Sequence, residues 1–285
     1  MAKAHRREPT TPGLPPAWVS RVRLVHPFPS ILVTGITVAM AFLADESPNR
    51  PIVVALGLGM LSYQFAIGVA NDVVDAADDA RWKPWKAIPR GAVSRRVATL
   101  LVAVLAGLGV AVTSGLRLEA WVIGMAGLAC GLAYDVSLKR TAWSWAPFAI
   151  AFPLVPAWVF VALDAWDALL WWVFPLGALL GFALHLANQA PDVPKEASVR
   201  GLAHRLGTER AANLSLGLVG LAGVVAVAVL LMEGSGTQAL LVAAAGLLAH
   251  TLGRRAVQLF GPDGLFGLLA TTAAAMAVAF VSAAR

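Results

Sequence analysis

The chain has 285 residues, of which 59% are hydrophobic and only 13% are charged, and its mean hydropathy is +0.74. An ordinary soluble domain carries about 25% charged residues, so this composition excludes that class and indicates a polytopic membrane protein. The net charge of +6 would also fit a nucleic-acid-binding protein, but the positions of the charges argue against that class. The single cysteine, Cys130, excludes a disulfide within the chain.

Residues 1–27 are polar, rich in proline and basic, and they are too long and too polar for an ordinary signal peptide. We expect them to form an N-terminal tail. The stretch PPAWVSRVRLVHPF at its end fits a short helix lying at the membrane surface. A basic flank of the first span with no other role fits equally well.

Residues 28–285 contain a series of apolar stretches, each of a length that can cross a bilayer as a helix. Because backbone groups in lipid must satisfy their own hydrogen bonds, helices are the expected element. We therefore predict an all-α polytopic membrane protein, with nine transmembrane helices in one bundle and a central cavity that opens to the cytoplasmic side. The predicted spans are approximately 28–44, 52–72, 97–114, 120–136, 145–163, 168–188, 212–232, 238–252 and 264–283.

The lysine and arginine residues divide unequally between the two sides of this nine-span arrangement. All of the 22 except Arg50, Arg117 and Arg285 fall in the N-terminal tail or in the loops on its side. By the positive-inside rule, the N-terminus is cytoplasmic and the C-terminus is external. The positive charge is thus a consequence of topology, and we expect no nucleic-acid partner. We predict a multi-pass integral membrane protein of a bacterial plasma membrane, with its active site on the cytoplasmic side.

The run NDVVDAADD, residues 71–79, follows the second apolar span. On a helix, Asn71, Asp75 and Asp79 lie four residues apart and share one face. Asp78 lies beside that face and Asp72 lies on its flank. Oxygen ligands on one face suit Mg²⁺, which often bridges to substrate phosphates. A solvated helix end is the simpler interpretation, but ionisable groups at the edge of an apolar segment are costly and usually functional.

A second stretch after the sixth span repeats this spacing, with Asn188, Asp192 and Glu196. It also falls at a cytoplasmic end. Pro191 and Pro194 would disturb a regular helix there, so the position of Glu196 on the same face is left open. The repeat suggests two acidic patches that offer two Mg²⁺ sites to one cavity.

Basic and phenolic groups are predicted on the same side of the membrane. The segment YDVSLKR supplies Tyr134, Lys139 and Arg140, and the loop KPWKAIPRG supplies Lys83, Lys86 and Arg90. Taken singly, the cations fit positive flanks and the tyrosine fits an interfacial aromatic. Together with the acidic patches they indicate a metal–diphosphate site above an apolar bundle. A molecule with a diphosphate head and a long apolar tail is a prenyl diphosphate.

These segments resemble the UbiA superfamily of intramembrane prenyltransferases. The matching motifs are the acidic run at 71–79, KPWKAIPRG, YDVSLKR, PDVPKEASVRGLAHRLG and the entry RVRLVHPFPS, and the resemblance covers almost the whole chain. It implies that residues 28–285 form one such domain. It also implies Mg²⁺-dependent transfer of a prenyl group to an aromatic or lipid acceptor. The second acidic motif departs from the family pattern at Gln189, Lys195 and Glu196, which suggests a specialised subfamily.

The resemblance also implies roles for individual residues. The implied catalytic residues are Asp75, Asp192, Tyr134 and Lys139. The implied diphosphate-binding residues are Asn71, Lys86, Lys139, Arg140 and Asn188. The implied metal ligands are Asn71, Asp72, Asp75, Asp79, Asp192 and Glu196. Gln64 and His185 are candidates for acceptor contacts, although a helix–helix hydrogen bond is the better interpretation of each. Tryptophans at 143, 145, 158, 171 and 172 are candidates to shield a cation, with interface anchoring as the commoner role.

Three alternative functions are left open by the residues. One is a terpene cyclase of the same architecture, in which the substrate's own chain captures the cation. Another is a phosphoribosyl-type transferase acting on a lipid phosphate. The third, from a different class, is an ion-coupled transporter, for which carboxylates would be expected near the membrane midplane rather than gathered at one face.

Overall fold

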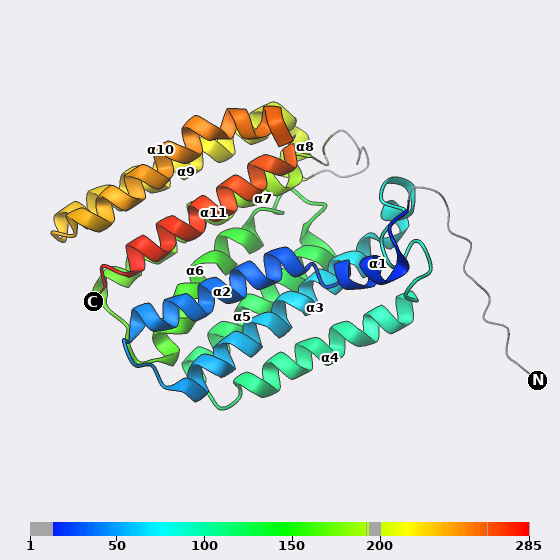
Figure 1. Cartoon of the computed structure of the whole chain (residues 1–285), viewed down its shortest axis with the longest axis horizontal. Coiled ribbons are helices and arrows are strands. Elements are labelled where there is room, and N and C mark those ends of the chain that lie inside the picture. Colours follow the sequence, from blue (N-terminus) through cyan, green and yellow to red (C-terminus); the bar gives the residue numbers. More distant parts are fainter. Residues whose placement is uncertain (1–13, 192, 194–200, 261, 285) are drawn as a thin grey trace, which may run out of the picture.

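The computed structural model describes residues 14–191, 193, 201–260 and 262–284, and within these ranges it contains helices and turns but no strand. The predicted all-α fold is confirmed (Figure 1). The helices are α1 (Ala17–Arg23), α2 (Pro27–Ala44), α3 (Arg50–Trp82), α4 (Arg95–Thr113), α5 (Leu118–Ala133), α6 (Ala146–Ala162), α7 (Val173–Gln189), α8 (Leu202–Leu206), α9 (Thr208–Met232), α10 (Gly236–Phe260) and α11 (Pro262–Val281). A π-helical turn, η1 (Tyr134–Leu138), extends α5, and a 3₁₀ turn, η2 (Ala168–Trp172), precedes α7.

Eight helical segments in the described part of the chain are long and apolar enough to cross a membrane. The exception among the predicted spans is α6, an apolar helix of 17 residues. The chain is thus a multi-span membrane protein by the length and composition of its helices. A ninth crossing by α6, and a cytoplasmic opening of the bundle, stay predictions.

Helices that follow one another in sequence pack side by side. This holds for α2 with α3, α3 with α4, α5 with α6, α6 with α7, α9 with α10 and α10 with α11. The bundle closes because α11 returns to pack against α2 and α7. Figure 1 shows α4 and α10 at opposite outer edges of the bundle, so the remaining long helices surround its centre.

The longest helix, α3, continues through the whole acidic run and ends at Trp82. The predicted span ended at residue 72, so the helix extends ten residues beyond it. Asn71, Asp75 and Asp79 therefore do share a continuous helix, as the spacing predicts. Asp72, Asp75 and Asp79 are all buried, which a solvated helix end does not explain.

Close packing between α6 and α7 positions one wall of the bundle's centre. A Cβ atom at Gly181 would lie 2.3 Å from the backbone oxygen of Phe148, so only glycine fits at this position. A Cβ atom at Gly177 would similarly lie 2.9 Å from the backbone of Pro153. The two glycines let α7 approach α6 at the level of Phe148, whose ring faces the cavity described below.

The predicted surface helix before the first span forms as α1, and it packs onto the loop between α3 and α4. Ser20 Oγ donates to the Trp85 carbonyl at 2.7 Å. Arg90 donates to the Pro15 carbonyl at 2.6 Å and to Ser20 Oγ at 2.9 Å, and Arg21 donates to the Ala92 carbonyl at 3.2 Å. The N-terminal segment thus fixes the loop that carries Lys86.

Candidate active site

A cavity of about 560 Å³ lies in the centre of the bundle. Its lining comes from α2, α3, α5, α6, α7, α9 and α11, together with η1 and the loop after α3. Most of the lining is apolar, and hydrogen bonds and ion pairs join many of its polar side chains at the end where α3, α5 and α7 terminate. The main polar residues of the lining are His26, Asn71, Asp75, Lys83, Lys86, Tyr134, Asp135, Lys139, Asn188 and Gln189.

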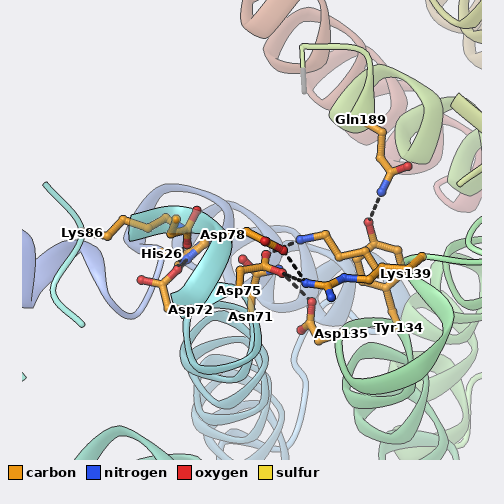
Figure 2. A network of polar contacts seen from close by, with 12 residues as sticks. His26, Asn71, Asp72, Asp75, Asp78, Lys86, Tyr134, Asp135, Lys139 and Gln189 are labelled. Carbon is orange, nitrogen blue, oxygen red and sulfur yellow. Dashed lines mark hydrogen bonds and ion pairs between the residues drawn. The ribbon is translucent and has the colours of Figure 1, made fainter. Parts of the chain in front are cut away.

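One ion-pair network joins α3 to the segment after α5. Lys139 Nζ contacts Asp75 Oδ2, and the guanidinium of Arg140 lies 3.8 Å from Asp75 Oδ1 and 2.7 Å from Asp78 Oδ2. Figure 2 shows the side chains of Asp75 and Lys139 pointing toward one another from the two elements. Asp75 is 7% exposed, and an unpaired carboxylate at that depth would be strongly unfavourable. Lys139 and Arg140 provide the compensating charge.

A second network lies beside the first, on the α3–α4 loop side. Lys86 Nζ donates to Asp72 Oδ1 and to Asp79 Oδ2, each at 2.7 Å. Burial lowers the pKa of the Lys86 ammonium, but the attraction of the two carboxylates outweighs burial and holds this pKa above its usual value. Lys86 is therefore a fixed positive charge on the cavity wall.

His26 ties the N-terminal segment to this second network. Its Nε2 lies 3.0 Å from Asp72 Oδ1, so the imidazole and Lys86 share one carboxylate oxygen. The backbone of His26 is left-handed, with φ of 49°, at the break between α1 and α2. A non-glycine residue in this conformation is strained by about 1 kcal/mol or more, and the bond to Asp72 offsets part of that strain.

Asp135 is a buried acid that was not among the predicted site residues. It lies in η1, where the wider helical turn follows α5, and it is 4% exposed. Asn71 Nδ2 donates to Asp135 Oδ1 at 2.8 Å. Because a carboxylate only accepts hydrogen bonds, this contact places the amide nitrogen of Asn71 toward Asp135 and leaves its carbonyl oxygen facing elsewhere. An acid directly after Tyr134, at the end of an apolar span, was the available signal.

Tyr134 is the first residue of η1, and its side chain contacts α6 and α7. Gln189 Nε2 donates to the Tyr134 hydroxyl at 2.9 Å, and the Tyr134 ring packs edge-on against Phe148 with centroids 5.0 Å apart. Phe152 stacks next to Phe148, at a centroid separation of 6.2 Å. All three rings line the cavity, whereas none of its described lining residues is a tryptophan. The aromatic wall is thus built from phenylalanine and tyrosine rather than from the tryptophans considered as candidates.

The two candidates for acceptor contacts differ in position. Gln64 lines the cavity, and its amide nitrogen lies 3.6 Å from Met60 Sδ. His185 is fully buried behind the wall, where its Nε2 lies 3.0 Å from Ser144 Oγ. His185 therefore makes a hydrogen bond from a helix to a loop rather than the expected helix–helix bond, and Gln64 is a cavity residue.

Most of the predicted site residues within the described ranges meet around this cavity. Asn71, Asp75, Lys86, Tyr134, Lys139 and Asn188 line it. Asp72 and Asp79 are not part of the lining and instead contact Lys86, while Arg140 is the more exposed partner of Asp75 and Asp78. The remaining two predicted metal ligands, Asp192 and Glu196, lie outside the described residues.

The donor set is suited to a hard divalent cation. Asn71 contributes an amide oxygen and Asp75 a carboxylate, and both belong to the cavity wall. Within the described ranges no three His, Cys, Asp or Glu side chains are arranged to hold a metal ion. The described part of the site therefore fits Mg²⁺ that keeps waters or substrate phosphates as its other ligands.

Comparison with known proteins shows what this architecture is similar to. The model of the UbiA prenyltransferase family matches residues 32–265. Comparison with curated protein sequences gives no match.

Solved structures of low sequence identity share the fold. A UbiA homologue from Archaeoglobus fulgidus, bound to DMAPP and Mg²⁺, is 16% identical, with a TM-score of 0.71 over 91% of this chain and 98% of that one. A UbiA homologue from Aeropyrum pernix K1 is 18% identical, with a TM-score of 0.71 over 88% of this chain and 96% of that one. A structure described as digeranylgeranylglyceryl phosphate synthase is 15% identical, with a TM-score of 0.68 over 94% of this chain and 98% of that one.

The family match spans most of the chain and includes the acidic run of α3, the loop that carries Lys86 and the turn that carries Tyr134. The likeness to the solved structures covers 88% to 94% of this chain and agrees with that match in fold. The chain belongs to the UbiA prenyltransferase family.

Proposed function

We propose that this protein is a Mg²⁺-dependent intramembrane prenyltransferase that moves a prenyl group from a prenyl diphosphate to an aromatic or lipid acceptor. The observation that carries the proposal is a single cavity with two chemically different parts. Paired carboxylates and cations lie at one end, and a long apolar wall continues from them. A prenyl diphosphate has the same two parts. The structures of other UbiA homologues with GPP or DMAPP and Mg²⁺ support the choice of this substrate class.

The charged end is suited to a diphosphate because its cations are held ready by carboxylates. Lys86 and Lys139 line the cavity, and Arg140 lies behind Asp75. Asn71 and Asp75 would hold one Mg²⁺, whose positive charge would neutralise the diphosphate. Asp192 and Glu196 are the proposed ligands of a second Mg²⁺. Asp75 would then no longer require Lys139 as its counter-charge. Lys139 could turn from the carboxylate to the diphosphate oxygens.

Cleavage places negative charge on the leaving diphosphate, and these cations stabilise that charge. The allylic C–O bond breaks with its electron pair on the diphosphate. The acceptor nucleophile forms the new bond to the allylic carbon and releases one proton. Phe148, Phe152 and Tyr134 lie along the cavity next to the charged end, where their ring faces can stabilise a developing cation. The apolar wall excludes water that would otherwise hydrolyse the intermediate.

The proposal includes an orientation in the membrane. The C-terminal half of α3, the end of α7 and the turn η1 after α5 meet at the charged side of the cavity, through the bonds of Asn71 to Asp135 and of Gln189 to Tyr134. The basic residues on this side support a cytoplasmic position for it and for the N-terminus, by the positive-inside rule. A gathering of acids at one end of the bundle also disfavours the transporter alternative, which needs them near the midplane.

The test is diphosphate release by the purified chain in detergent. Prenyl diphosphates of increasing length are supplied with Mg²⁺, with and without a lipid and small-molecule extract of the host. Release that depends on both Mg²⁺ and extract is expected, and the mass of the product identifies the acceptor. Release without extract, together with a cyclised hydrocarbon or alcohol, would assign the chain to the cyclase alternative. No release and no binding in either arm would refute the diphosphate site.

A further inference from the structure

Two buried oxygen atoms at the charged end of the cavity have no hydrogen-bond partner within the described part of the chain. They are Asp135 Oδ2 and Gln189 Oε1. Each side chain is 4% exposed, and both residues belong to the cavity lining. Buried polar atoms in folded proteins are nearly always hydrogen-bonded, so a buried carboxylate oxygen without a partner requires an explanation.

The other polar atoms of these two side chains are already engaged. Asp135 Oδ1 accepts from Asn71, and Gln189 Nε2 donates to the Tyr134 hydroxyl. Figure 2 shows Gln189 at the hydroxyl end of Tyr134 and Asp135 near its backbone end. The atoms left over on either side of Tyr134 are therefore both acceptors. Both residues line the cavity, so a group bound there lies next to both side chains.

The unpaired acceptors define the chemistry of the group that would complete them. That group must be a hydrogen-bond donor, because a carboxylate cannot donate. It must also be uncharged or positive, since Asp75 and Asp135 lie close together and would repel a carboxylate placed between them. Lys139 Nζ contacts Asp75 and makes no hydrogen bond to Asp135 Oδ2.

We propose that Asp135 and Gln189 each bind a hydroxyl group of the second substrate, and that this substrate is a neutral acceptor with two hydroxyl groups rather than a carboxylate. The inference rests on the proposed function and names the acceptor class for it. In the transfer, the allylic C–O bond breaks with its electrons on the diphosphate. The acceptor hydroxyl oxygen forms the new C–O bond, and the hydroxyl proton leaves with the diphosphate.

Matched acceptors test the proposal, with the full chain, Mg²⁺ and geranyl diphosphate. The aromatic pair is 4-hydroxybenzyl alcohol and 4-hydroxybenzoate, and the lipid pair is hexadecane-1,2-diol and 2-hydroxyhexadecanoate. We expect the alcohol of at least one pair to be used with a kcat/KM about tenfold higher or more than its carboxylate. The pair that reacts shows whether the acceptor is aromatic or lipid. Binding of unreactive geranyl thiolodiphosphate is measured separately.

Two substitutions move the discrimination in opposite directions. Asp135→Asn keeps the shape and an acceptor for Asn71 but removes the charge. It should raise the KM for the alcohol about fivefold to tenfold and narrow the preference over the carboxylate by a similar factor. Gln189→Glu adds a negative charge, and it should increase the preference for the alcohol over the carboxylate. The affinity for geranyl thiolodiphosphate should stay within about twofold for Asp135→Asn. Asp45→Asn, at the exposed end of α2, is the charge-matched control.

Several results would overturn the inference. One is a wild-type preference for the carboxylates. Another is a Mg²⁺ requirement or thiolodiphosphate Kd that rises in Asp135→Asn while the acceptor KM is unchanged, since this would make Asp135 part of the metal–diphosphate site. An unchanged discrimination in Gln189→Glu would also contradict it, even if Asp135→Asn failed to fold. Absence of thiolodiphosphate binding to the wild type would refute the proposed function, and the acceptor site with it.

Discussion

The two acidic stretches of this protein differ in how much charge they bring to the cavity. On α3, Asp72, Asp75 and Asp79 are buried and each contacts a lysine. At the end of α7, the described residues that reach the cavity are Asn188 and Gln189, which are neutral amides. Similar spacing in the sequence therefore does not give equivalent sites. The α3 side holds paired charges, and the described part of the α7 side contributes hydrogen bonds.

The α3 side also shows why its pairs matter for binding. Each of these buried carboxylates contacts a lysine that a diphosphate could attract in its place. The site is then a set of exchangeable ion pairs, in which Mg²⁺ and the diphosphate must arrive together to replace both partners. Substitutions that remove one charge at a time from the α3 side test this difference between the two sides.

The largest expected effect is that of Asp75→Asn. The substitution removes a charge at the centre of the first network while keeping the shape of the side chain. We expect Mg²⁺-dependent diphosphate release to fall by about 100-fold or more, in line with the loss of one group that stabilises a charged transition state. Asp78→Asn is the matched control, because Asp78 is more exposed and its ion pair within the described residues is with Arg140. A loss in the control as large as in Asp75→Asn would contradict the assignment.

Lys139→Met and Arg140→Met compare a buried cation with an exposed neighbour. The side chain of Lys139 is 14% exposed and that of Arg140 is 52% exposed. A charge in a desolvated site interacts more strongly than one in contact with water, so Lys139→Met should lower kcat by about tenfold to 100-fold. Arg140→Met should lower it by less than about tenfold. Single-turnover rates would measure both, and equal effects would show that burial does not distinguish the two cations.

Lys86→Met tests stability. It leaves Asp72 and Asp79 without their shared cation, and removal of one partner from a buried ion pair costs about 3 kcal/mol or more. We expect the Tm in detergent to fall by at least about 5 °C. Added Mg²⁺ should recover more of this loss than it adds to the wild-type Tm. Arg81→Met, an exposed change in the last turn of α3, should leave the Tm within about 1 °C.

The pH dependence of the Lys86 contribution has a defined sign. The folded protein raises the pKa of Lys86, so the stabilisation is fully present below the unfolded lysine pKa of about 10.4 and is lost as pH rises through the folded value. The difference in Tm between wild type and Lys86→Met should therefore be the same at pH 6 and pH 9. A difference that shrinks by half over this range would contradict a raised pKa.

The helices were largely predictable from the sequence because hydropathy reports them directly. The run of α3 past residue 72 was not apparent as a span, since its acids lower the local hydropathy although they stay helical and buried. The shared face of Asn71, Asp75 and Asp79 followed from the helical period alone. Local pattern was enough for these features.

The parts of the site that were missed depend on contacts between distant segments. Asp135 meets Asn71 across 64 positions of the sequence, and His26 meets Asp72 across 46. No local pattern reports such pairs. The π-helical turn that buries Asp135 also has no signature in the residues YDVSL. Gln189 was noted as a departure from the family pattern, but its bond to Tyr134 is a property of the fold.

We expect the ion pairs of α3 to open only when Mg²⁺ and a diphosphate bind together. The most direct test is the Tm of the purified protein with Mg²⁺ alone, with geranyl diphosphate alone and with both. Each ligand alone would leave an uncompensated charge, so we expect small shifts singly and a large shift together, absent in Asp75→Asn. An equal shift with either ligand alone, or an unchanged combined shift in Asp75→Asn, would contradict the account.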